Sequence, residues 1–137
     1  MDPERVARIA DKLAHAEERL GQFEAWAPTA LEDVRDRLAS YKAFQEAVEA
    51  VMDVIAMIAK EVGATAKDDY TNIERLEGEA LTAVSADALR EANGLRNRLV
   101  HEYNGLSDQL ALASGEDLTA RMRRAIKEVR AWTSEAA

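Results

Sequence analysis

Four polar side chains near residue 100 have the types and spacing needed for chemistry on a phosphate: Arg96, Asn97, His101 and Tyr103. On a helix that turns about 100° per residue, Asn97 and His101 stack on one face. Tyr103 lies about 20° from Arg96 on the same helix, two turns further along. A guanidinium can hold a phosphate by two parallel hydrogen bonds, and an imidazole can exchange protons near neutral pH. Such a set is sufficient for metal-free cleavage of RNA.

A structural interpretation accounts for the same spacing. An arginine on a helix usually pairs with a carboxylate, and a lone histidine is more often structural than catalytic. The spacing of Arg96 and His101 alone therefore favours an ordinary ion-paired helix face. The longer string of residues around them shifts the interpretation from a structural helix face toward a catalytic site.

Residues 94–105 read Gly-Leu-Arg-Asn-Arg-Leu-Val-His-Glu-Tyr-Asn-Gly, which resembles the signature of the HEPN superfamily and specifically of its HepT-like toxin branch. That signature is an arginine, four residues, a histidine, one residue and a tyrosine. Arg96, His101 and Tyr103 match it, and Asn97 stands in the expected polar place. The resemblance extends loosely over residues 35–132.

The resemblance implies a metal-independent endoribonuclease toxin that needs no cofactor and forms a symmetric homodimer, with two Arg–His motifs lining one cleft. By matched position, Arg96 and His101 would be catalytic toward RNA and Asn97 would support them. The partner of such a toxin is usually a small nucleotidyltransferase antitoxin of the MNT type. It neutralises the toxin by adding AMP to the motif tyrosine, which here would be Tyr103.

Two other classes of function stay open. The first is a non-catalytic HEPN helical module whose Arg–His face binds a nucleotide or a nucleotidyltransferase partner. The second is a plain helical adaptor or dimerisation protein. The intact set of motif residues favours the nuclease, because a binding module has less need for all of them.

The elements that must position this motif are helices, since strand signals are almost absent. Asp2 and Pro3 are typical of a helix start, and apolar residues then recur every three or four positions, which predicts a helix over residues 3–23. Pro28 breaks it and opens a second helix over residues 28–62, continuous or kinked near residues 39–42, with Gly63 as its stop.

Three further helices follow in the chain. A short one is predicted over residues 70–79, and a fourth runs from residue 86 to about 102 or 103 with Ser85 as its cap. A brief helical segment follows Ser107. Ser114 is predicted to cap the last helix, which runs to about residue 133. The fold class is all-α, a single domain over residues 1–137 forming an up-and-down, HEPN-like bundle of about four to six helices.

Residues 50–59 are apolar on every side of the second helix except at Asp53. A helix of this kind must be covered on every side, which in a small domain suggests a second subunit. A buried carboxylate needs a partner. Asp53 is therefore predicted to form a structural ion pair, or to orient Arg96 or His101.

The composition narrows the classes of protein. The chain has 137 residues, a net charge of −8, no Cys and two His, which excludes disulfides, thiolate zinc sites and Cys nucleophiles and leaves no evident metal site. No apolar run approaches the roughly 20 residues that span a bilayer, and the N-terminus does not resemble a signal peptide, so we expect a cytoplasmic protein without membrane contact.

His15 is interpreted as a surface or packing residue. The basic run within residues 118–132 is a phosphate-binding flank or, more simply, a solvated face paired with acidic neighbours.

Overall fold

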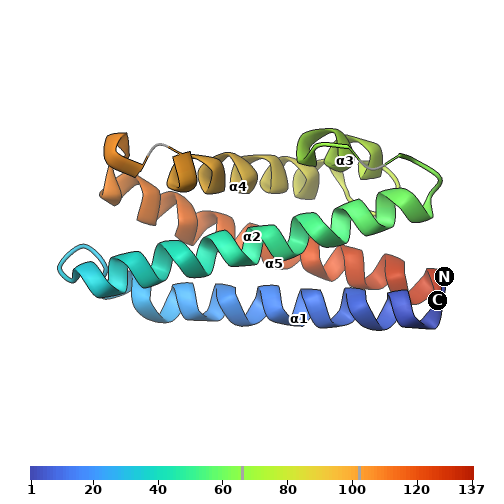
Figure 1. Cartoon of the computed structure of the whole chain (residues 1–137), viewed down its shortest axis with the longest axis horizontal. Helices are drawn as coiled ribbons and strands as arrows, with labels where there is room; N and C mark the ends of the chain where they lie inside the picture. The colour runs from blue at the N-terminus through green and yellow to red at the C-terminus, as the bar shows by residue number, and fades with distance from the viewer. Residues whose placement is uncertain (66, 102) are drawn as a thin grey trace.

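The computed structural model describes residues 1–65, 67–101 and 103–137, apart from the side chain of Tyr103. In these residues the chain forms five α-helices, two 3-10 turns and no β-strand (Figure 1). The helices are α1 Pro3–Trp26, α2 Val34–Glu61, α3 Asp69–Leu76, α4 Ala83–His101 and α5 Asp108–Ala136, and the turns are η1 Ala27–Thr29 and η2 Tyr103–Gly105. The long helices lie side by side, which confirms the predicted all-α, up-and-down bundle. None of the described helices is long and apolar enough to cross a membrane.

Helix α1 begins where the sequence predicted. Asp2 caps it by accepting a hydrogen bond from the Glu4 backbone N–H at 3.0 Å, and Pro3 occupies the first turn. The predicted apolar stripe is buried against α2 and α5 and consists of Ile9, Leu13, Ala16, Leu20 and Phe23.

The start of α2 differs from the prediction by six residues. Pro28 lies in η1, and α2 begins at Val34, with Asp33 as its cap. The Asp33 carboxylate accepts hydrogen bonds from two backbone N–H groups, at 2.8 and 3.1 Å. The side chain of a proline has no acceptor and cannot cap a helix in this way. From there α2 runs unbroken to Glu61, and Gly63 follows with a φ of 86°, as expected of a helix stop.

The apolar segment at residues 50–59 is covered within one chain. Most of its side chains are buried, and α2 contacts α1, α3 and α4 along its length. Asp53, the one charge, is exposed to solvent. The segment therefore does not need a second subunit to cover it, contrary to the sequence argument, and a dimer must be argued from other residues.

Ser85 does not cap α4. The cap is made by Thr82, whose Oγ1 accepts a hydrogen bond from the Ser85 backbone N–H at 3.3 Å. Ser85 is buried in the helix and donates its hydroxyl to Glu128 of α5 at 2.8 Å. Glu128 also accepts from the Thr82 backbone N–H at 2.8 Å. Burial raises the pKa of Glu128, but these hydrogen bonds outweigh burial and leave the pKa below its ordinary value.

The last helix is longer than predicted, because α5 begins at Asp108 and absorbs the brief segment after Ser107. Ser107 is the cap, accepting from the Leu110 backbone N–H at 3.3 Å, and Ser114 lies inside the helix. Gly115 follows it, directly beneath the Phe23 ring. Gly115 is thus a site of close packing between α1 and α5.

We expect Gly115→Ala to destabilise the protein by about 1 kcal/mol or more. An added Cβ would stand 2.6 Å from the Phe23 ring, and overpacking of this kind costs about 1–3 kcal/mol against a gain of about 0.5–1 kcal/mol for alanine in a helix. The matched control is Gly21→Ala in α1, where no heavy atom lies within 4 Å and a small gain is expected. The free energies of unfolding come from chemical denaturation. Equal stability of Gly115→Ala and the wild type would contradict the packing argument.

Candidate functional site

The arginine of the motif is held by two acceptors from two helices. Arg96 of α4 donates from Nη1 to Oδ1 of Asn97 at 2.8 Å and from Nη2 to Oε1 of Glu49 in α2 at 3.1 Å. Its side chain is 26% exposed. The guanidinium is therefore fixed in orientation at the surface between α2 and α4, as an anion-binding group must be.

Arg96 keeps hydrogen-bond donors for a further ligand. A guanidinium carries five N–H groups, and the contacts with Asn97 and Glu49 use two of them. Nε is buried and has no hydrogen-bond partner among the described residues. The remaining N–H groups of Nη1 and Nη2 can bind a phosphate oxygen without breaking either contact.

His101 is the last residue of α4 and is exposed to solvent. The C-terminal end of a helix favours a nearby positive charge, such as a protonated imidazole. His101 stands five residues after Arg96, which on a helix places it about 7.5 Å further along the axis. Tyr103 follows in η2, and its side chain lies outside the described residues. Because α4 ends at His101, Tyr103 is not on the helix that carries Arg96, contrary to the sequence expectation.

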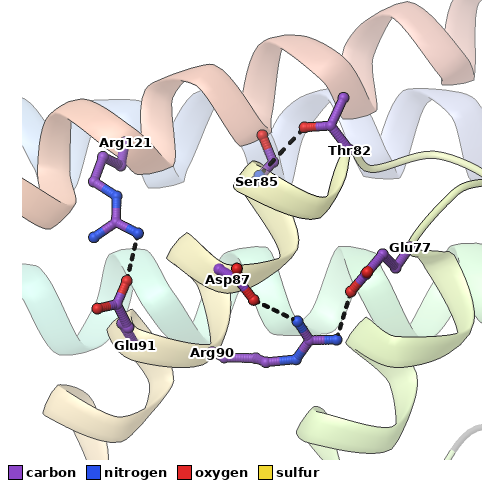
Figure 2. Close-up of polar contacts among 7 residues, drawn as sticks. All are labelled: Glu77, Thr82, Ser85, Asp87, Arg90, Glu91 and Arg121. Carbon is purple, nitrogen blue, oxygen red and sulfur yellow. Dashed lines mark hydrogen bonds and ion pairs between the residues drawn. The ribbon is translucent and has the colours of Figure 1, made fainter.

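Helix α4 is clamped on the side away from α2 by further ion pairs (Figure 2). Arg90 donates to Glu77 at 2.7 Å, which joins α4 to the end of α3, and to Asp87 of its own helix at 2.8 Å. The hydrogen bond to Glu77 is the main reason that the pKa of Arg90 lies above its ordinary value. Arg121 of α5 pairs with Glu91 of α4. These contacts fix the helix that carries the motif.

Asp53 was predicted either to form an ion pair or to orient Arg96 or His101, and in the structure it forms an ion pair. Asp53 contacts Lys12 of α1 at 3.2 Å. The carboxylate that reaches Arg96 belongs to Glu49, one turn earlier on α2, and sequence reasoning missed it. Only the alignment of α2 against α4 distinguishes Glu49 from the other acids on the same helix.

The basic run in α5 is a face paired with acidic neighbours, which was the simpler of the two interpretations of this segment. Each of its four arginines contacts a carboxylate, which leaves little positive charge there for a phosphate. The pairs are Arg121–Glu91, Arg123–Glu24, Arg124–Glu128 and Arg130–Glu17.

His15 is exposed on α1, at the edge of a groove between α1 and α2. Within the described ranges, no group of three or more His, Asp or Glu could hold a metal ion.

Several curated proteins are similar to part of the chain. A protein named "Putative RNase" from Archaeoglobus fulgidus is 40% identical over 83 residues, which are 60% of this chain and 63% of that protein. Another of the same name and organism is 46% identical over 76 residues, 55% of this chain and 57% of that protein. A "Putative RNase" from Methanocaldococcus jannaschii is 42% identical over 65 residues, 47% of this chain and 75% of that protein. The first two matches thus span less than two thirds of either relative.

Two solved structures share the fold. A toxin–antitoxin complex with AMP-PNP superposes with a TM-score of 0.82 at 16% identity, covering 94% of this chain and 99% of that one. The tri-AMPylated HEPN toxin of Shewanella oneidensis, in complex with MNT antitoxin, gives a TM-score of 0.78 at 19% identity over 96% and 99%. At such identities the likeness concerns the fold alone.

A match to a family model decides the membership, because it spans nearly the whole bundle and includes the helix that carries the motif. The model of the family described as ribonuclease HepT-like matches residues 7–129. The chain therefore belongs to the ribonuclease HepT-like family of the HEPN superfamily.

Proposed function

We propose that the protein is a metal-independent endoribonuclease toxin, active as a homodimer and neutralised by an MNT-type nucleotidyltransferase antitoxin. The observation that carries the proposal is the Arg96 guanidinium, which Asn97 and Glu49 hold in place while it keeps free N–H donors. It lies on the same helix as the exposed imidazole of His101. A fixed cation and a proton-transfer group are the minimum that cleavage of an RNA phosphodiester requires.

The proposed mechanism uses only side chains of this chain. Arg96 binds the non-bridging oxygens of the scissile phosphate and stabilises the negative charge that grows in the transition state. A His101 imidazole accepts the proton of the 2′-hydroxyl as its oxygen attacks phosphorus. The second imidazole of the dimer donates a proton to the 5′-oxygen as the P–O bond breaks. Asn97 supports the reaction by keeping the guanidinium in place, and no metal or cofactor takes part.

Arg96→Ala and His101→Ala should each reduce the rate of RNA cleavage by about 10²–10⁴-fold. Both side chains are at the surface, so the circular dichroism spectrum should not change. The matched controls are Arg98→Ala, on the solvent side of the same helix, and His15→Ala on α1, both exposed and expected to cleave normally. Cleavage by the wild type should persist in EDTA. A wild type that binds RNA without cutting it would instead favour a non-catalytic HEPN module.

The proposed dimer rests on exposed apolar side chains beside the motif. Leu38 of α2 is 49% exposed and Val100 of α4 is 45% exposed. Leu38 lies three turns before Glu49 and within about 20° of it around α2, and Val100 lies about 40° from Arg96 around α4. Because α2 and α4 run in opposite directions (Figure 1), both side chains lie on the same side of the Arg96–Glu49 contact, Val100 about 6 Å and Leu38 about 16 Å from it along their helices. Pairing them across a two-fold axis would bring two motifs together.

Light scattering at micromolar concentration should give the mass of a dimer. A structure of that dimer should show an interface of more than about 1,000 Å² in total. Leu38→Glu should shift the protein to monomer and reduce cleavage, because a charge would be buried in the apolar contact. Val84→Glu is the control, since Val84 is 54% exposed at the opposite end of α4. A monomeric wild type, or a dimer unaffected by Leu38→Glu, would rule out this interface.

The proposed control of the toxin acts through Tyr103, which follows the end of α4 in η2. An AMP group on its hydroxyl would add a bulky base and a negative charge that competes with RNA for the guanidinium. The likeness to a tri-AMPylated HEPN toxin in complex with MNT antitoxin supports a partner of this class.

Incubation with an MNT-type partner and ATP should add one or more AMP units and silence cleavage. Intact-mass spectrometry should show this gain for the wild type but not for Tyr103→Phe, which should cleave RNA and escape modification. Tyr70→Phe is the control, because Tyr70 is 43% exposed on α3 and its loss should not prevent silencing. Peptide mapping that places the AMP on another residue would remove this proposal.

A further inference from the structure

Glu49 places a negative charge on the group that is proposed to bind the phosphate of RNA. Its Oε1 lies 3.1 Å from Nη2 of Arg96. A phosphate that binds the same guanidinium comes within a few ångströms of this carboxylate and is repelled by it. An acid at this position must therefore offset the repulsion by a contribution either to the stability of the fold or to the reaction.

The contact contributes little to the stability of the fold. The Glu49 side chain is 46% exposed, and ion pairs at such positions are worth about 0–1 kcal/mol. A large share of the Arg96 side chain is buried, but its Nε makes no hydrogen bond within the part of the chain that the structure describes. The two Nη contacts are thus what fixes the direction of the guanidinium.

Glu49 differs from the acids around it. It lines a groove of about 390 Å³ between α1 and α2 together with Asp11, Glu46 and Asp53. Glu46 pairs with Arg19 at 3.3 Å and Asp53 with Lys12 at 3.2 Å, both cations of α1. Glu49 instead contacts Arg96 of α4.

We infer that Glu49 is a positioning residue for Arg96 and that it also weakens the binding of RNA. This inference rests on the proposed nuclease function. Holding the guanidinium in one orientation favours the transition state, because no ordering of Arg96 is needed during the reaction. The same negative charge opposes the phosphate in the bound ground state. Removal of Glu49 should therefore change binding and turnover in opposite directions.

The test compares Glu49→Ala with Glu49→Gln. Binding is measured with an RNA that carries a 2′-deoxy substitution at the cleavage site and cannot be cut. At low salt, Kd should fall about fivefold in both variants, as expected for the loss of one like charge near the phosphate in water. The kcat for cleavable RNA should fall about tenfold in Glu49→Ala. It should fall less in Glu49→Gln, because the amide oxygen can still accept a hydrogen bond from Arg96.

Glu46→Gln is the matched control. It removes the same charge from the same helix and groove, but Glu46 pairs with Arg19. Its kcat should equal that of the wild type, and its Kd should change by less than about twofold because this charge lies further from the phosphate. A Kd that falls as far in Glu46→Gln as in the Glu49 variants would mean that net charge alone is responsible, and would overturn the inference.

A readout without RNA separates this inference from the proposed function. Phenylglyoxal should modify Arg96 several-fold faster in Glu49→Ala than in the wild type, as measured by peptide mapping. Arg90, which Glu77 and Asp87 hold, is the internal reference and should react at the same rate in both. A wild type that neither binds nor cuts RNA would defeat the proposed function even if this rate rises. An unchanged rate, or equal kcat in Glu49→Ala and the wild type, would overturn the role of Glu49.

Discussion

The attachment of helix α4 to its neighbours, through buried apolar side chains together with ion pairs and hydrogen bonds, is the constraint on which the motif depends. Ala86, Ala88 and Ala92 are fully or almost fully buried. These small residues let the helices approach closely, and Leu89, Leu95 and Leu99 are buried with them and provide the larger apolar contacts. Polar contacts with three neighbouring helices add to this packing and are made by Glu77, Glu128, Arg121 and Glu49.

The helices with strong local signals could be predicted from the sequence. Asp2 and Pro3 define the start of α1, and Gly63 defines the end of α2, because capping and positive φ depend on a few adjacent residues. The errors arose where two local signals compete or where a partner is distant in sequence. Helix α2 begins after Asp33 and not at Pro28. Ser114 and Gly115 resembled the start of the last helix, although the glycine lies inside α5 and accommodates the ring of Phe23.

The candidate site was predictable in part, for the same reason. Arg96, Asn97 and His101 are near in sequence, so helical spacing and the motif were enough to bring them together. Glu49 and Arg96 are 47 residues apart, and their contact exists only because two antiparallel helices align at that level. The sequence drew attention to Asp53, one turn away, as an ion pair or as a group that orients Arg96 or His101, because an acid among apolar residues is conspicuous in a sequence. The structure leaves that acid exposed beside Lys12.

The attachment of α4 at its N-terminal end has a consequence for proton linkage. The folded-state pKa of Glu128 lies below its ordinary value of 4.5. Its hydrogen bonds to Thr82 and Ser85 therefore stabilise the fold fully above that pH, and the contribution is lost as pH falls through the folded-state pKa. Imidazole groups change charge closer to neutrality. A pH profile of cleavage recorded above about pH 5 would thus report chemistry at the motif, undisturbed by protonation of the carboxylate that anchors its helix.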